Sequence, residues 1–221
     1  MLAEEVTISM GAIQLEGELA VPSEAKGVVL FAHGSGSSRH SPRNQYVARV
    51  LHDAGMGTLL FDLLTAAEEE LEAYTAHLRF DIPLLASRLA EATRWLFRQN
   101  VLHHLGVGYF GSSTGAAAAL VAAAELGDKV SCVVSRGGRP DLAEDALEEV
   151  TAATLLIVGG NDTPVITLNE EAYARLHCEK QLRLIPGATH LFEETGALER
   201  VARLASEWFM DHLHPVEHHS L

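Results

Sequence analysis

The feature of this sequence that most restricts its fold is an alternation of short apolar runs with longer amphipathic segments. The apolar runs occupy residues 28–32, 58–61, 106–110, 131–134, 154–158 and 182–185. They are too short for buried helices, and most are rich in β-branched or aromatic residues, as strands covered on both faces are. Amphipathic segments typical of helices lie at roughly 43–54, 82–99, 114–126, 141–149, 167–177 and 196–213. This alternation predicts an α/β fold, a parallel sheet with helices on both faces.

Residues 6–20 follow a different pattern. Apolar and polar residues alternate there on either side of Met10-Gly11-Ala12, which predicts an antiparallel hairpin at the edge of the sheet. The sheet should then have about eight strands, the first two antiparallel and the rest parallel. No repeat or linker divides the 221 residues, a length common for one domain, so we expect a single domain over residues 1–221.

Charge and composition exclude several classes of partner. The chain has 16 Lys and Arg against 30 Asp and Glu, a formal charge of −14, so it should repel nucleic acids and anionic membrane surfaces. No apolar run approaches the roughly 20 residues of a membrane span, and Met1–Glu5 does not resemble a secretory signal. Two cysteines cannot form a disulfide scaffold. We expect a cytoplasmic protein with a small-molecule substrate; its oligomeric state stays open.

Chemistry in such sheets collects at the carboxyl ends of the strands. Gly111-Ser112-Ser113-Thr114-Gly115 follows one predicted strand and matches the G-x-S-x-G nucleophile elbow, with Ser113 at its centre. The motif requires a tight strand-to-helix turn, and the small residues of 116–119 suit a helix pressed against the sheet. At that helix N-terminus, backbone N–H groups favour a developing negative charge.

A nucleophilic serine needs a base, and the base needs an acid to orient it. Asp162 follows the apolar run at 154–158, and His190 follows the last run, before the C-terminal helix. Each alone would more often be structural. Together, in the order Ser113, Asp162, His190 and at three strand ends, they predict a catalytic triad.

The same logic predicts where the oxyanion of the reaction binds. One donor should be the backbone N–H of Thr114, and the other should come from the loop His33-Gly34-Ser35-Gly36-Ser37, with Ser35 favoured over Gly36. His33 is interpreted as a structural residue that shapes this turn.

Two competing motifs are rejected. Gly106, Gly108 and Gly111 spell G-x-G-x-x-G, but they fall inside a predicted strand, whereas a dinucleotide-binding motif opens a helix. The histidines near the C-terminus are interpreted as a solvated tail and not as a metal site; they are His212, His214, His218 and His219. The residues therefore predict neither a cofactor nor a metal ion.

These residues resemble those of the α/β-hydrolases, and among them the small cap-less members of the dienelactone-hydrolase-like group. The resemblance covers almost the whole chain, from the His33-Gly34 turn through Ser113 and Asp162 to His190. It implies the eight-stranded hydrolase fold and acyl-transfer chemistry without a cofactor. Dienelactone hydrolases proper use a cysteine nucleophile where this chain has Ser113, so dienelactone itself is not predicted as the substrate.

The predicted loops suggest an open pocket. Only some eighteen residues separate Arg136 from Ala153, where family members with a cap domain insert far more. The longest connection after a predicted strand is residues 63–80. Within it, Thr65 and Glu68 form a capping-box pattern typical of the start of a short helix. Asp81 resembles the N-cap of the helix that follows. The larger apolar residues of this connection could wall the pocket or only support a surface helix: Leu63, Leu64, Tyr74 and Phe80.

Arginines are the less expected feature of loops around Ser113. Arg39 and Arg43 follow the oxyanion loop, and Arg136 and Arg139 follow the strand at 131–134. They could bind a substrate carboxylate or only pair with nearby acids such as Asp141. Gly36, Arg39 and Arg136 are the candidate substrate-binding residues, with Arg136 preferred because it directly follows a strand.

The function predicted on this basis is that of a serine hydrolase acting on small carboxylic esters or lactones, with some preference for anionic substrates. Two alternatives stay open. The chain could be a binding or regulatory protein whose triad is idle, because a fold alone does not prove turnover. It could also be an acyltransferase that passes its acyl group to an acceptor other than water.

Overall fold

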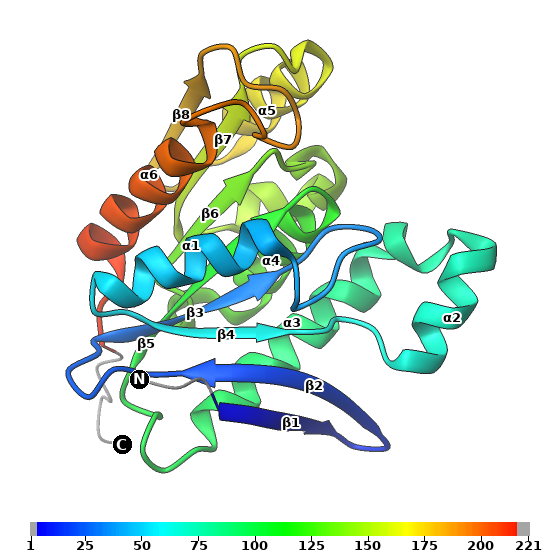
Figure 1. The fold of residues 1–221 in the computed structure, drawn as a ribbon, viewed down its shortest axis with the longest axis vertical. Coiled ribbons are helices and arrows are strands. Elements are labelled where there is room, and N and C mark those ends of the chain that lie inside the picture. Colours follow the sequence, from blue (N-terminus) through cyan, green and yellow to red (C-terminus); the bar gives the residue numbers. More distant parts are fainter. Residues whose placement is uncertain (1–3, 216–221) are drawn as a thin grey trace.

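The computed structural model describes residues 4–215. The first three residues, part of the segment considered as a secretory signal, and His218 and His219 lie outside that range. One eight-stranded sheet runs through the described chain, as expected (Figure 1). Its strands are β1 (Glu4–Met10), β2 (Ile13–Ala20), β3 (Gly27–Ala32), β4 (Gly57–Phe61), β5 (Gly106–Ser112), β6 (Cys132–Arg136), β7 (Ala153–Gly159) and β8 (Lys180–Ile185).

The strand order is β1-β2-β4-β3-β5-β6-β7-β8. β1 and β2 pair antiparallel, β2 also lies antiparallel to β4, and every remaining pair is parallel. The predicted edge hairpin is therefore confirmed, with Gly11 at a φ of 64° in its turn. Strands β3 and β5 to β7 are buried along their whole length, which explains why their sequences are continuously apolar.

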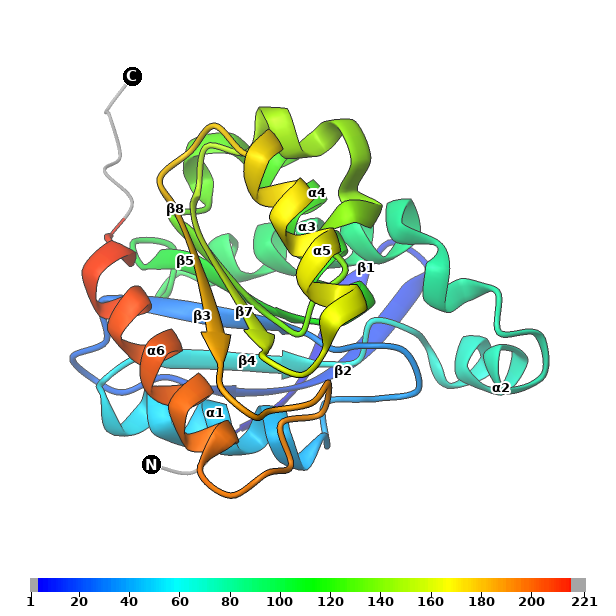
Figure 2. The same ribbon diagram turned by 90° about the horizontal axis from the view of Figure 1, so that it is seen from above.

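Helices cover both faces of the sheet (Figure 2). They are α1 (Pro42–Asp53), α2 (Ala66–Thr75), α3 (Ile82–Phe97), α4 (Thr114–Leu126), α5 (Thr163–Arg175) and α6 (Ala197–His212). α1 and α6 lie on one face, and α3, α4 and α5 lie on the other. α2 projects from the body of the molecule at the end of the sheet where β4 finishes (Figure 1). No helix within residues 4–215 is long and apolar enough to cross a membrane.

Two apolar clusters hold these layers together, one on each face. Under α1 and α6, the rings of Phe31 and Phe110 lie 5.0 Å apart between centroids. On the other face Tyr109 is fully buried, and its hydroxyl lies 2.6 Å from the hydroxyl of Thr93 on α3. The central strands β3 and β5 are thereby fixed from both sides, and the loops that follow them start from a rigid base.

Most predicted helices are confirmed to within about two residues at each end, but α5 begins at Thr163, four residues before the predicted start, because Asp162 and the proline after Thr163 begin the helix. Thr65 and Glu68 form the capping box of α2, and the Asp81 carboxylate caps α3 by accepting from the Leu84 N–H at 3.0 Å. The helix predicted at 141–149 is wrong: residues 140–149 form two short 3₁₀ turns separated at Glu144, where φ is 49°. Ala143 and Leu147 are both buried, so the helix-like spacing of apolar residues survives although the backbone does not continue as a helix.

Candidate active site

Ser113 occupies the turn between β5 and α4. Its φ of 52° and ψ of −125° lie outside the regions that residues with a Cβ normally adopt, a conformation that costs on the order of 1–3 kcal/mol. Its hydroxyl forms no helix-capping hydrogen bond, and its carbonyl accepts from the N–H of Ala116 and of Arg139, at 3.1 and 3.0 Å. The turn is therefore held by the backbone, and the hydroxyl is left available for chemistry.

Two glycines allow this turn to be so tight. A Cβ on Gly111 would lie 2.5 Å from the Cα of Ala116, and one on Gly115 would lie 2.1 Å from the carbonyl oxygen of Ala32. Real Cβ atoms do not approach backbone atoms this closely. The first turn of α4 thus packs directly on β3 and β5, as the G-x-S-x-G spacing predicts.

His190 and Asp162 are joined by a hydrogen bond. The Nδ1 of His190, in the segment between β8 and α6, lies 2.7 Å from the Oδ2 of Asp162, the residue before α5. The Asp162 side chain is only 13% exposed and that of His190 is 41% exposed. With Nδ1 donating to the carboxylate, the ring is oriented and its Nε2 is the nitrogen left to act on a neighbouring hydroxyl.

Ser113 and His190 line the same cavity, which has a volume of about 220 Å³. The residues around it come from the loop after β3, the start of α1, and the segments after β5, β6 and β8. They are Gly34, Ser35, Ser37, Ser41, Arg43, Ser112, Ser113, Arg136, Gly137, His190 and Leu191. The structure therefore brings the three residues of the predicted triad together at one edge of the sheet.

The two residues predicted to supply the oxyanion donors are in contact through their side chains. The Ser35 and Thr114 hydroxyl oxygens are 3.1 Å apart, and Thr114 is the first residue of α4, so its N–H has no acceptor within the helix. Gly36, which has a φ of 66°, does not line the cavity of Ser113. It lines an adjoining open groove of about 590 Å³ instead.

His33 has the structural role expected of it. It is buried, and its Nε2 accepts a hydrogen bond from the N–H of Leu63 at 3.0 Å. Burial lowers the pKa of this imidazole, which keeps the ring neutral and able to accept. His33 thus ties the loop after β3 to the segment after β4.

Arg136 is the charged group that stands out in the cavity. It is the last residue of β6 and only 7% exposed, and no ion pair to it is present within the described residues. One guanidinium nitrogen lies 3.3 Å from the Asn44 side-chain oxygen, and Nε has no partner. Burial, and secondarily the charge of Arg43, lower the pKa of Arg136 to about 10. An anionic group would compensate the charge of this nearly buried cation.

The other arginines differ in what they contact. Arg39 does not line the cavity: its guanidinium pairs with Asp62, and its N–H donates to the same carboxylate at 2.8 Å. Arg139 forms two hydrogen bonds with Asp141, at 2.9 and 2.7 Å, and does not line the cavity either. Arg43 lines it, with Glu193 3.4 Å away. Of the four arginines, Arg43 and Arg136 therefore line the cavity of Ser113, and Arg136 is the one of these two without a carboxylate partner in the described part of the chain.

The proposed pocket walls also divide into two groups. Leu63 and Leu64 are buried and line a narrow recess that also contains Ser35 and Thr114. Tyr74 is 90% exposed and Phe80 is 58% exposed, and neither lines that recess.

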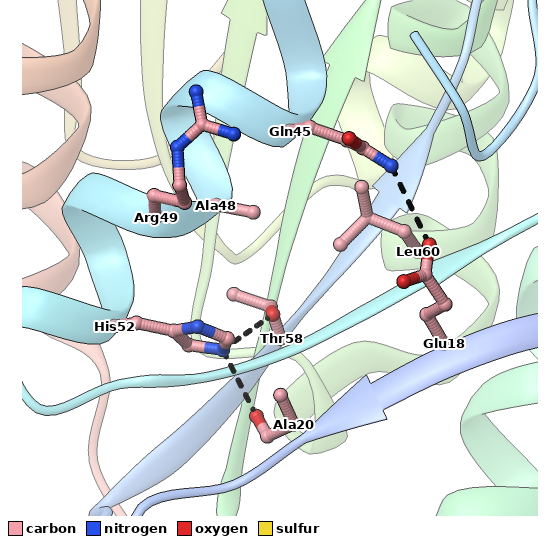
Figure 3. A pocket seen from close by; sticks show the side chains of 8 residues that line it. All are labelled: Glu18, Ala20, Gln45, Ala48, Arg49, His52, Thr58 and Leu60. Atoms are coloured by element: carbon pink, nitrogen blue, oxygen red, sulfur yellow. Dashed lines mark hydrogen bonds between the residues drawn. The ribbon is translucent and has the colours of Figure 1, made fainter. Parts of the chain in front are cut away.

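A separate cavity of about 180 Å³ lies between α1 and strands β2 and β4 (Figure 3). It contains none of the predicted catalytic residues. The Nε2 of His52 lies 2.8 Å from the Thr58 hydroxyl and 3.2 Å from the Ala20 carbonyl oxygen, so this polar group is satisfied within the protein. Nowhere in residues 4–215 do three or more His, Cys, Asp or Glu side chains form a group suited to a metal ion.

The sequence analysis did not identify Asn44, a residue of α1 whose side-chain oxygen accepts a hydrogen bond from the Arg136 guanidinium. The signal was available: the buried residues of α1 are Asn44, Val47, Ala48 and Leu51, so a polar residue occupies the stripe that faces the sheet. A polar residue in an apolar stripe indicates a buried polar contact, although its partner could not be named from the spacing alone.

Known proteins similar to this chain fall into two groups. No protein-family model matches it. Two Mycobacterium tuberculosis proteins, with the provisional name phosphoribosyl transferase, are 59% identical to it over 210 residues. The match covers 95% of this chain and 46% of each of theirs, so the chain spans about half the length of the curated relatives it matches.

Among solved structures, a dienelactone hydrolase from Anabaena variabilis is 61% identical, with a TM-score of 0.94 over 96% of this chain and 100% of its own. Est1E from Butyrivibrio proteoclasticus is 16% identical, with a TM-score of 0.78 over 94% of this chain and 98% of its own, and is similar in fold alone.

The packing of the elbow predicts the effect of a single methyl group. Gly115→Ala should lower the free energy of unfolding by about 2 kcal/mol or more, because its Cβ would collide with the Ala32 carbonyl. Gly11→Asn, in a turn with open space around it, should change it by less than about 1 kcal/mol. Urea unfolding followed by circular dichroism measures both, and equal effects would contradict the tight packing of the elbow.

The unpaired charge of Arg136 predicts a variant that is more stable than the wild type. Arg136→Met should raise the free energy of unfolding by about 1–3 kcal/mol, because it removes a buried cation that no carboxylate compensates. Arg139→Met, which breaks an existing pair with Asp141, is the matched control and should not stabilise. A destabilised Arg136→Met protein would show that the guanidinium supports the fold.

Proposed function

Because this chain belongs to the α/β-hydrolase family, as a small member of its dienelactone-hydrolase-like group, we propose that it is a serine hydrolase of small carboxylic esters or lactones. The observation that carries the proposal is that Ser113, in its strained turn, lines one cavity with His190, whose Nδ1 is hydrogen-bonded to Asp162. A hydroxyl, a base and an orienting acid are the groups that acyl transfer requires.

In the proposed reaction the Ser113 hydroxyl attacks the carbonyl carbon, and Nε2 of His190 takes its proton. The negative charge that develops on the carbonyl oxygen is held by the N–H groups of Ser35 and Thr114, at the positive end of α4. Asp162 stabilises the imidazolium that forms. His190 then returns the proton to the leaving oxygen, which departs and leaves an acyl group on Ser113.

Water completes the cycle. His190 removes a proton from a water molecule that attacks the acyl carbonyl, and the tetrahedral intermediate breaks down to the carboxylic acid and free Ser113. The cavity is open and lined by polar groups, which gives water access to the acyl-enzyme. This supports hydrolysis over transfer to another acceptor.

The names of the relatives bear on the substrate in different ways. The Anabaena protein is named for a lactone substrate, which supports including lactones in the proposed class. The transferase name belongs to proteins about twice as long as this chain. We do not extend that name to this chain, because the match leaves more than half of each of those proteins uncovered and the residues this chain gathers at its sheet edge are suited to acyl transfer.

The triad predicts how substitutions affect catalysis. Ser113→Ala and His190→Ala should each lower kcat for 4-nitrophenyl acetate by several orders of magnitude, and Asp162→Asn by somewhat less. A variant with both Ser113→Ala and His190→Ala should be about as slow as either single variant, since the residues act as a unit. A double variant much slower than both would contradict the scheme.

Covalent labelling tests the nucleophile directly and separates the alternatives. A fluorophosphonate should modify Ser113 and no other residue, as mapped by mass spectrometry, and Ser113→Ala should abolish the label. Labelling elsewhere, or none, would overturn the proposal. A labelled protein that hydrolyses no activated ester would be a binding protein with an idle triad. Ester products formed from added alcohols in preference to the acid would identify an acyltransferase.

Arg136 predicts a preference for anionic esters. The leaving oxygen must lie near His190, which protonates it, and Arg136 lines the same cavity, so the anion should be carried by the alcohol part. 4-Acetoxybenzoate should be cleaved about tenfold better than 4-acetoxybenzamide in kcat/KM, after each is divided by its uncatalysed rate. Arg136→Met should abolish this ratio and Arg139→Met should retain it. Equal corrected kcat/KM values for the two esters in the wild type would show that Arg136 has no role in binding the substrate.

A further inference from the structure

One carboxylate beside the proposed site lacks the partner that its neighbours have. Around α2 each of three acids pairs with its own arginine: Asp62 with Arg39, Glu68 with Arg88, and Glu72 with Arg79. Glu69 lies among them on α2 and forms no ion pair within residues 4–215. The cationic groups nearest to it are already engaged by other carboxylates.

Glu69 lines the space that leads to Ser113. It borders the open groove of about 590 Å³ together with Gly36 and Asp62, and it also borders the narrow recess of Leu63 and Leu64. Ser35, a proposed oxyanion donor, lines this groove, this recess and the cavity of Ser113 and His190. The three spaces therefore meet at Ser35.

The unpaired charges of the cavity and the groove are opposite. Within residues 4–215, Arg136 in the cavity of Ser113 has no carboxylate partner and Glu69 in the groove has no cationic one. Arg43, which lines both spaces, is paired with Glu193 at 3.4 Å.

Burial raises the pKa of Glu69 and the charges of Asp62 and Glu72 add to the effect, while the charge of Arg79, which is paired with Glu72, opposes it. A positively charged ligand group would relieve both the repulsion and the desolvation of this carboxylate.

The direction of the proposed reaction decides which part of a substrate meets Glu69. His190 must reach the leaving oxygen, so the alcohol part occupies the cavity that contains His190 and Arg136. The acyl part is bonded to the opposite side of the carbonyl carbon. In the proposed binding mode it extends into the groove and the recess that contain Glu69, which meet the cavity at Ser35.

We propose that Glu69 forms a binding site for a protonated amine on the acyl part of the substrate. The inference rests on the proposed hydrolase function and narrows its substrate class to esters or lactones of amine-bearing acids. Together with Arg136, Glu69 selects substrates that carry a positive charge on the acyl side of the ester bond and a negative charge on the alcohol side.

Two rigid esters of the same size test this. They are the 4-nitrophenyl esters of piperidine-4-carboxylic acid, a protonated amine at neutral pH, and of cyclohexanecarboxylic acid, its neutral analogue. After division by the uncatalysed rates, the amine ester should have about tenfold higher kcat/KM. Glu69→Gln should reduce that ratio to within about twofold of one.

Glu70→Gln is the matched control. Glu70 is the next residue on α2 and is exposed, and its substitution removes the same charge from a chain of net charge −14 that attracts cations generally. The ratio should survive in this variant. A ratio lost equally in both variants, or retained in Glu69→Gln, would overturn the proposal.

Wild-type protein alone provides a second measurement that does not depend on how a variant folds. Raising NaCl from about 0.05 M to about 1 M should lower the preference for the amine ester, because the groove is open and salt screens exposed charges. No preference at low salt would overturn the proposal. Hydrolysis of the neutral ester that requires Ser113 would still support the proposed function, so the two can fail separately.

Discussion

The turn at Ser113 is the constraint on which the rest of this structure depends. Ser113, a residue with a Cβ, has a φ of 52° and alone connects the last residue of β5 to the first residue of α4. That geometry is tolerated only because Gly111 and Gly115 let the helix touch the strands, and because Arg139 donates its N–H to the Ser113 carbonyl. The strain is compensated by burial of α4, whose first six residues are all fully or nearly fully buried.

The segments around this turn are fixed by contacts that are themselves buried. His33 joins the loop after β3 to the segment after β4, and Asn169 on α5 donates to the Gly138 carbonyl at 3.1 Å, in the loop after β6. Asp162 and Asn169 thus anchor two segments of the site from the same part of the chain. Groups that must act together are held by the sheet and its helices and not by long loops, which keeps their relative positions defined.

The charges around the site are not all paired. Three of the acids around α2 have an arginine partner, yet within residues 4–215 Glu69 in the groove has no cationic partner and Arg136 in the cavity has no carboxylate. Leaving a buried or half-buried charge uncompensated costs free energy, and that cost is tolerated where a ligand can supply the missing partner. The chain has 30 acidic residues, so a carboxylate for Arg136 was readily available and its absence is specific.

The sequence by itself determined the type of the strands and their succession along the chain, the hairpin at the edge and the elbow at Ser113, because these follow from local spacing. The order of the strands within the sheet was decided by tertiary structure. The kink at Glu144 and the roles of the arginines were decided only by tertiary structure. Arg39 and Arg136 look equivalent in sequence, but Asp62 lies 23 residues from Arg39 and Asn44 lies 92 residues from Arg136. Which partner an arginine finds depends on the packing of distant segments, and the spacing of residues along a chain carries no record of that packing.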